Sequence, residues 1–205
     1  MPRQPDPDLE ERILKAAQAL WKRGGDHALT LRAVARAAGT NTPAVYRRFK
    51  DRRDLVRGLL MRTVSRVRTS FEAGETIEEM AEAYVNLALD DPHEYELFYT
   101  YGRELHPAKR VGRPKPIRES RPNFALLEQR LAKRLGGLPQ DHTRMALSLW
   151  ALMHGATSLL LSASIPDGHE EELREAYRTA ISTLLEEPGR FGEKSRQKPR
   201  GKKRK

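Results

Sequence analysis

The 205-residue sequence contains no cysteine, so a disulfide framework and a cysteine-based metal site are excluded. Its six histidines are scattered and show no metal-type spacing with carboxylates. The glycine pairs Gly24-Gly25 and Gly136-Gly137 fall where helices are expected to end, so they do not indicate a glycine-rich phosphate loop. The sequence also contains no Gly-x-Ser-x-Gly motif. These absences argue against an enzyme, and they predict neither a metal ion nor a cofactor.

Long apolar runs are scarce as well. The N-terminal stretch MPRQPDPDLEER is polar and lacks the apolar core of a signal peptide, so we expect a cytoplasmic protein. Residues 145–165 form the most apolar run, and its length approaches that of a membrane span. Serine, threonine and histidine side chains interrupt this run, and the other helical segments are amphipathic. The pattern therefore favours a buried helix of a bundle and no membrane partner.

The positive charge of the chain is concentrated at its two ends. The net charge is +10, but residues 194–205 alone carry eight cations and no anion. Without this tail, 30 basic residues face 28 acidic ones. Residues 1–60 hold thirteen Lys and Arg against seven Asp and Glu. Basic ends suggest a polyanionic partner such as DNA, and a tail that only aids solubility is the alternative.

Hydrophobic residues recur at helical spacing along the first 71 residues, and short polar breaks separate four predicted helices. Two short helices that meet at a glycine are typical of a helix-turn-helix motif. Threonine, asparagine and aspartate are favoured as N-caps at helix starts, and glycine is favoured at helix ends, so these residues set the predicted boundaries. The expected boundaries are Asp6 as cap and Gly24–Gly25 as end of the first helix, Thr30 and Gly39 for the second, Asn41 with Pro43 for the start of the third, and Asp51 for the start of the fourth.

The third predicted helix separates two kinds of side chain. Val45 and Phe49 are four residues apart, so they share one face and can pack on the first two helices. Tyr46 and Arg47 fall on other faces, where a hydroxyl can donate to a phosphate and a guanidinium can reach bases or phosphates. One aromatic residue thus anchors the helix, and the other can face DNA together with Arg47 and Arg48. An ordinary basic helix of a solvated bundle is the alternative.

The stretch from Arg12 to Leu55 resembles the DNA-binding domain of the TetR family of transcriptional regulators. The resemblance rests on the segments ILKAAQAL, LTLRAVARAAG, AVYRRF and DLV in this order and spacing. It implies that the third helix enters the major groove and that Tyr46 and Arg52 contact phosphates. Thr40, Asn41 and Pro43 differ from the residues common in the family, so the base preference stays open. The DNA-binding residues that we expect are Thr30, Arg32, Asn41, Thr42, Pro43, Tyr46, Arg47, Arg48, Lys50 and Arg52.

The remainder of the chain is predicted to form a helical regulatory domain, so the protein as a whole is expected to be all-α. A loop rich in proline and basic residues is expected at 106–122. The family resemblance implies that the last two long helices pair across a two-fold axis, so we expect a homodimer through residues 141–163 and 170–186. Helices are expected at 76–90, from Pro92 to Gly102, and at 123–135, 145–165 and 170–186. The expected divisions are a DNA-binding domain at 1–56, a regulatory and dimerisation domain at 57–190 and a basic tail at 191–205.

A ligand pocket is the second site that the sequence predicts. Trp150, His154 and Gly155 resemble a Trp-His-Gly signature of one subclass of TetR-like C-terminal domains. Trp150 and His154 share a helix face, and the segment at 92–102 concentrates aromatic residues. A packed core with a satisfied histidine is the alternative. The ligand-binding residues that we expect are Tyr95, Phe98, Tyr99, Trp150 and His154, and six cations at 106–122 leave the charge of the small-molecule effector open.

These patterns together predict a ligand-responsive repressor that binds a palindromic double-stranded operator as a homodimer. An architectural DNA-binding protein is the alternative. Gly112-Arg113-Pro114 resembles the core of an AT-hook, in which an extended arginine binds a narrow minor groove. The basic tail would add affinity without sequence preference.

Overall fold

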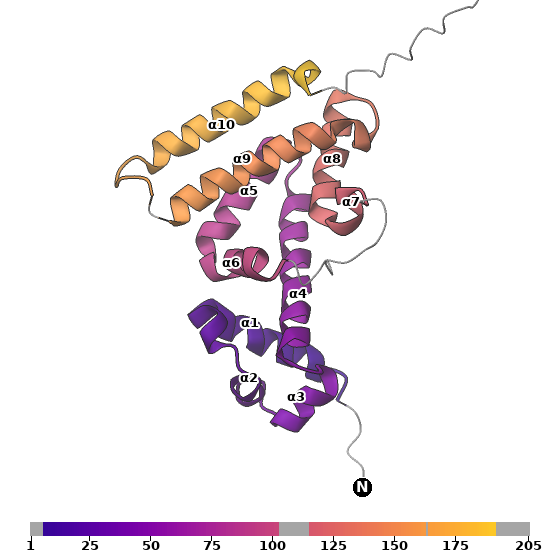
Figure 1. Cartoon of the computed structure of the whole chain (residues 1–205), viewed down its shortest axis with the longest axis vertical. Coiled ribbons are helices and arrows are strands. Elements are labelled where there is room, and N and C mark those ends of the chain that lie inside the picture. The colour runs from indigo at the N-terminus through magenta and orange to yellow at the C-terminus, as the bar shows by residue number, and fades with distance from the viewer. Residues whose placement is uncertain (1–5, 103–114, 163, 192–205) are drawn as a thin grey trace, which may run out of the picture.

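The computed structural model describes residues 6–102, 115–162 and 164–191, and within these ranges it contains ten α-helices and no β-strand. The predicted all-α fold is confirmed. Figure 1 shows α1, α2 and α3 at one end of an elongated molecule, α4 running away from them, and the later helices gathered at the other end, with α9 and α10 outermost. The Gly112-Arg113-Pro114 segment and the 194–205 tail lie outside the described residues.

The first body is built from α1 (Leu9–Ala28), α2 (Leu31–Ala37), α3 (Thr42–Arg48) and the start of α4 (Arg52–Ala73). Three side-chain caps occur where the sequence predicts them, each satisfying a backbone N–H that has no partner inside its helix. Thr30 accepts from the Ala33 N–H at 3.1 Å, Asn41 from the Ala44 N–H at 2.9 Å, and Asp51 from the Asp54 N–H at 2.8 Å.

The predicted helix end at Gly24–Gly25 is confirmed by the backbone, because both glycines leave the helical region, Gly25 with a positive φ of 55°, and only one short turn to Ala28 follows. Two other predicted boundaries are wrong. Asp6 is not the residue that precedes α1, which begins at Leu9 after Asp8, although its side chain accepts from the Asp8 N–H at 3.0 Å. The expected loop at 106–122 contains α7 (Ile117–Ser120) and the first residue of α8 (Pro122–Leu135). Proline ends a preceding helix but also fits the first position of a new one, as Pro122 does.

The second body contains α5 (Ile77–Asp90), α6 (Pro92–Tyr101), α8, α9 (Thr143–Leu161) and α10 (Glu170–Glu186). Its core is formed by buried residues of α4, α5, α8, α9 and α10, among them Phe71, Met80, Leu131, Leu149 and Ile181. Thr76 and Glu79 form a reciprocal capping box at the start of α5.

Helix α6 belongs to both bodies. Leu97 is fully buried in the core that α1 to α4 form, together with Trp21, Val45 and Phe49. Tyr95 and Tyr99 lie on another face of the same helix and contact His154 of α9. Helical periodicity within α6 shows that both faces are apolar, but it does not show that they join two different cores.

Helix α9 is only partly covered within one chain. It packs against α5 and α10. Leu147 and Leu159 are 37% and 41% exposed, although both sit in the most apolar segment of the sequence. Within the described residues, no helix combines the length and the apolarity needed to cross a bilayer.

Candidate DNA-binding surface and ligand cavity

Helix α3 lies at the free end of the molecule (Figure 1), and the face that it exposes is largely polar. Val45 and Phe49 are 0% and 5% exposed and anchor the helix to its body. Tyr46 is 53% exposed, and Pro43 and Arg47 are exposed beside it. This arrangement leaves a phenol and a guanidinium free to contact a partner, while the apolar face of the helix stays fixed.

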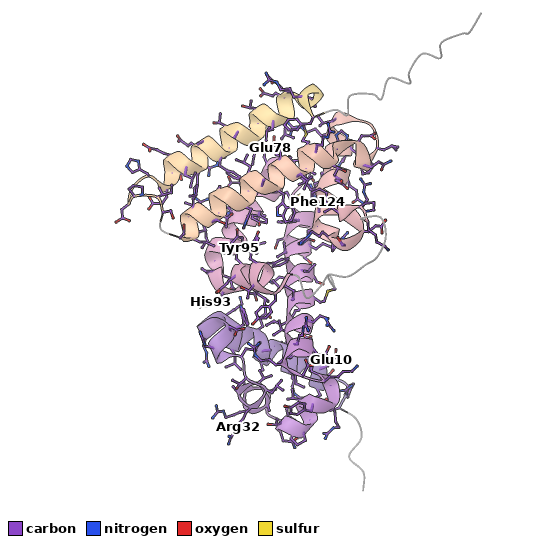
Figure 2. All side chains as sticks on the ribbon, in the orientation of Figure 1. Glu10, Arg32, Glu78, His93, Tyr95 and Phe124 are labelled. Atoms are coloured by element: carbon purple, nitrogen blue, oxygen red, sulfur yellow. The ribbon has the colours of Figure 1, made fainter. Side chains whose placement is uncertain are left out.

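Other residues of the predicted DNA-binding set surround α3. Arg32 is exposed on α2 at the same end of the molecule (Figure 2). Together with Asn41, Thr42 and Pro43 it lines a shallow hollow between α2 and α3. Lys50 is exposed just beyond α3. The side chains of Thr30 and Asn41 are engaged as helix caps, so their contribution to this surface is to hold α2 and α3 in place.

Two arginines of the predicted set are bonded within the chain. Arg48 donates from Nη2 to the Asp6 carbonyl oxygen at 3.1 Å. Arg52 donates from Nε to the Leu29 carbonyl at 2.9 Å and from Nη2 to Asp26 Oδ1 at 2.6 Å. Sequence spacing does not reveal these acceptors, because they lie more than twenty residues away along the chain.

The Arg52 contacts connect three helices. Tyr101, the last residue of α6, donates its hydroxyl to the same Asp26 carboxylate. Hydrogen bonding from Tyr101, and then from Arg52, lowers the pKa of Asp26 below its ordinary value. The start of α4 and the ends of α1 and α6 are therefore tied at one point by a charge-assisted network.

A cavity of about 570 Å³ lies in the second body between α4, α5, α6, α8 and α9. Its size is typical of sites for drug-sized molecules. The five residues that the sequence proposes for ligand binding, Tyr95, Phe98, Tyr99, Trp150 and His154, all line this cavity. The structure therefore brings together two segments that are about fifty residues apart in the chain.

One wall of the cavity is a chain of tyrosines and a histidine. Tyr95 hydrogen-bonds through its hydroxyl to His154 Nδ1 at 2.5 Å, and the Tyr99 ring stacks on the imidazole at 4.1 Å between centroids. The hydroxyls of Tyr84 and Tyr99 are bonded to each other. Burial raises the pKa of Tyr84 and of Tyr99 and lowers the pKa of His154. Tyr84, Tyr99 and His154 therefore favour their uncharged forms at neutral pH.

The floor of the cavity contains charges that sequence reasoning missed. Glu94 is 2% exposed and forms an ion pair with Arg66 of α4, and both line the cavity. Gln18 of α1 donates from Nε2 to Glu94 Oε1 at 2.5 Å. Lys22 of α1 pairs with Asp91, which also lies 3.7 Å from Arg66. Buried charges are stable when paired in this way, so the cluster joins the cavity to α1.

A second cation lies at the start of α8. The Arg121 guanidinium lies over the Trp150 ring, 5.2 Å from its centroid, in cation–π geometry. Phe124 contacts the same indole edge-on at 6.1 Å. Arg121 and Phe124 both line the cavity, although the sequence placed Arg121 in a loop.

The described part of the chain contains no cluster of three or more histidine, aspartate or glutamate side chains that could hold a metal ion. The polar groups of the cavity are instead suited to hydrogen bonds and ion pairs with an organic molecule.

Comparison with known families identifies the class of protein that these two sites define. Residues 13–59 match the family described as bacterial regulatory proteins, tetR family, and residues 77–184 match the tetracyclin repressor-like C-terminal domain. The chain therefore belongs to the TetR family, whose members are DNA-binding transcriptional regulators and not enzymes. No curated protein sequence matches the chain significantly.

Solved structures share the fold over nearly the whole chain. A protein of unknown function from Rhodococcus sp. RHA1 is 21% identical, with 90% of this chain and 96% of that chain covered and a TM-score of 0.66. The multidrug binding protein EbrR, solved with imidazole, is 23% identical, with coverages of 90% and 93% and a TM-score of 0.62. A TetR-family transcriptional regulator from Streptomyces coelicolor is 20% identical, with coverages of 89% and 99% and a TM-score of 0.60. At these identities the likeness concerns the fold alone.

Proposed function

We propose that this TetR-family regulator is a cytoplasmic, ligand-responsive repressor that binds a palindromic operator as a homodimer. The observation that carries the proposal is the double role of α6. It lines the cavity with Tyr95 and Tyr99, and it buries Leu97 in the core that supports α3. A ligand that moves α6 therefore changes the support of the DNA-contacting helix.

For DNA, we propose that α3 enters the major groove. Tyr46 contacts a phosphate, and Arg47, with Thr42 and Pro43, approaches the base edges. The exposure of these side chains on one end of the molecule supports this assignment. Because Arg52 is bonded to Asp26 and Leu29, its proposed contribution is to hold α4 in place beside the phosphate backbone rather than to reach far from it.

For the dimer, we propose that α9 and α10 pair with the same helices of a second copy. Leu147, Ala151, Gly155 and Leu159 are spaced by four residues, so they form one stripe along α9. The two leucines are exposed in the single chain, and a side-chain atom added at Gly155 would meet nothing within 4 Å. A partner helix would bury this stripe and bring two copies of α3 into a symmetric arrangement.

For the effector, we propose a mainly apolar aromatic molecule that occupies the cavity. EbrR has also been solved with ethidium, and a TetR variant from Acinetobacter baumannii AYE with minocycline. The aromatic lining of the cavity fits planar molecules of this kind, and Trp150, His154 and Gly155 fit the Trp-His-Gly subclass. Control requires that the ligand bind the DNA-competent and incompetent states with different affinity, and a coupling of about 1 to 3 kcal/mol changes operator affinity about 5- to 150-fold.

We propose that the chain is divided into a DNA-binding domain at 1–56, a regulatory and dimerisation domain at 57–190 and a basic tail at 191–205. The architectural alternative, which relies on Gly112-Arg113-Pro114 and on the tail, is not favoured by family membership. It predicts salt-dependent binding that is equal on all sequences.

Selection of bound fragments from a random DNA pool tests the proposal. We expect one enriched sequence with two-fold symmetry, bound by a species that sediments as a dimer. The affinity for this operator is then measured with candidate aromatic ligands. Trp150→Ala should reduce the effect of a ligand while operator binding without it stays nearly normal. Enrichment of no sequence, or binding by a monomer, would contradict the proposal.

A further inference from the structure

We propose that the effector is an aromatic acid, and that its carboxylate or sulfonate is bound by Arg121 at the start of α8. This inference rests on the proposed function, because it names the ligand class of the same cavity. It is carried by the distribution of paired and unpaired charge around that cavity.

Three charged side chains of the described residues line the cavity, and only one of them lacks a described partner of opposite charge. Arg66 and Glu94 form an ion pair with each other, and Lys22 and Asp91 extend it into a cluster of two cations and two anions. Within the described ranges, no carboxylate pairs with Arg121. The unbalanced charge of the lining is therefore positive, and a mainly apolar site with one unpaired cation favours an anionic ligand.

The position of Arg121 leaves its hydrogen-bonding edge available. The side chain is half-buried, and its guanidinium lies over the indole of Trp150. A guanidinium can stack on an aromatic face while its N–H groups bind a carboxylate bidentately in the plane. None of these N–H groups donates to an acceptor among the described residues. Trp150 thus holds the cation in place for a planar anion.

The other residues that line the cavity are compatible with a ligand in which an acidic group is attached to an aromatic ring system. Tyr84, Tyr95, Tyr99 and His154 supply hydrogen-bonding groups and flat ring surfaces, and none of them is a carboxylate that would compete with an anionic ligand. Asn123, next to Phe124 on the cavity wall, has a buried side-chain oxygen without a partner among the described residues. Rotation of its amide would turn the NH₂ group towards an anion.

A cationic ligand is the competing possibility, since Glu94 also lines the cavity. Such a ligand would have to displace Arg66 from the buried Glu94 carboxylate, and it would add a further positive charge to a cavity that Arg66 and Arg121 already line. Breaking a buried ion pair is costly, whereas pairing Arg121 with an anion breaks no existing ion pair of the described chain. The charge arrangement therefore favours the acid.

Two dyes with the same ring system test this inference directly. 8-Anilinonaphthalene-1-sulfonate is anionic, and N-phenyl-1-naphthylamine lacks the sulfonate. Their affinities and stoichiometries are measured by fluorescence on the full chain without DNA, together with the planar cation ethidium. We expect one anionic dye per chain, bound at least about 10-fold more tightly than the neutral dye, because charge-assisted hydrogen bonds exceed neutral ones.

Variants assign the effect to one residue. Arg121→Gln should weaken the anionic dye about 10- to 100-fold and change the neutral dye much less. Arg121→Lys keeps the charge but loses the planar fork, so an intermediate affinity is expected. Lys133→Gln removes a cation from an exposed position of the same helix and should change neither dye. Circular dichroism and urea unfolding establish that each variant is folded.

The possible failures are distinguishable. If the neutral dye or ethidium binds in the cavity as tightly as the anionic dye, the acid inference is overturned while a ligand-binding regulator stands. The same holds if Arg121→Gln weakens both naphthalene dyes equally, since Arg121 would then contribute packing alone. If no dye binds at one site per chain, both the acid inference and the proposed ligand control fall.

Discussion

At the scale of single residues, α3 places two aromatic side chains one turn apart in opposite environments. Phe49 is buried against α1 and α4, and Tyr46 is exposed. The difference between them is a hydroxyl group, which suits Tyr46 for a phosphate and would be costly at the position of Phe49.

Tyr46→Phe should weaken binding to operator and to unrelated DNA by a similar factor of about 10, because a phosphate contact carries no base information. Titration of the variant on the selected operator, on single-base substitutions of it and on random DNA measures this factor. A weakening confined to particular operator bases would show that Tyr46 takes part in base recognition.

His154 gives the cavity a pH dependence whose sign follows from burial. Its pKa in the folded chain is lowered from the ordinary value of 6.5, so the unfolded chain binds the proton more readily. The stability that this neutral imidazole contributes is present above the unfolded pKa and is lost as the pH falls through the folded pKa.

The free energy of unfolding should therefore fall more steeply below about pH 6.5 in the wild type than in His154→Gln, which has no proton to gain at this position. Urea unfolding at several pH values measures both slopes. Parallel curves for the wild type and His154→Gln would contradict the assignment.

At the scale of elements, α6 connects the two bodies beside α4, which contributes buried residues to both cores. Its first turn supplies Asp91 and Glu94 to the cluster with Arg66 and Lys22, and its last residue, Tyr101, reaches Asp26. The Trp21 indole also donates to the His93 carbonyl at 2.5 Å (Figure 2 shows His93 where the bodies meet). Polar contacts thus fix both ends of α6 to α1.

Glu94→Gln should lower the free energy of unfolding by about 1 to 2 kcal/mol, because the buried Glu94 carboxylate loses its charge-assisted bonds to Arg66 and Gln18, whereas Arg66 is 37% exposed and keeps Asp91 at 3.7 Å. Glu96→Gln changes the same residue type on the same helix, but its side chain is 63% exposed, so an effect below about 0.5 kcal/mol is expected. Urea denaturation of both variants measures the difference. Equal effects would mean that the cluster contributes no more than a surface charge.

Sequence patterns predict the local parts of this fold well and the tertiary parts poorly. The caps at Thr30, Asn41 and Asp51 are decided within four residues, so they can be predicted from the chain. The break of the first helix at Gly24–Gly25 is local as well, because glycine adopts the positive φ of Gly25 without a steric penalty. Leu97 and Arg121 depend on how distant helices meet, and spacing along one helix does not contain that information.

At the scale of the whole molecule, the proposed dimer depends on the uncovered stripe of α9. Gly155 lies in the middle of this stripe with open space in front of it. Glycine in a helix interior lowers helix stability by about 1 kcal/mol relative to alanine. A close approach by a second chain gives a physical reason for glycine at this position.

Gly155→Leu should leave the single chain folded, since an added Cβ has no neighbouring atom within 4 Å, and should weaken the dimer by about 10-fold or more. Sedimentation velocity over a range of concentrations measures the dimer. Glu10→Leu adds the same side chain to an exposed position on α1 and should have no effect. A dimer that is unchanged or tighter in Gly155→Leu would exclude this stripe from the interface.

We expect the basic tail to affect the strength of DNA binding rather than base recognition. Residues 194–205 carry eight cations and no large apolar side chain. Their composition therefore favours ion pairs with phosphates over packing in a hydrophobic core. Deleting them should leave the dimer and the selected operator unchanged and lower the affinity for random DNA. The salt slope of binding should fall by about 0.9 for each phosphate that the tail neutralises. Affinities for operator and random DNA, measured across a salt series for both lengths of chain, give these slopes. An unchanged slope would show that the tail does not bind DNA, and its charge would then serve solubility.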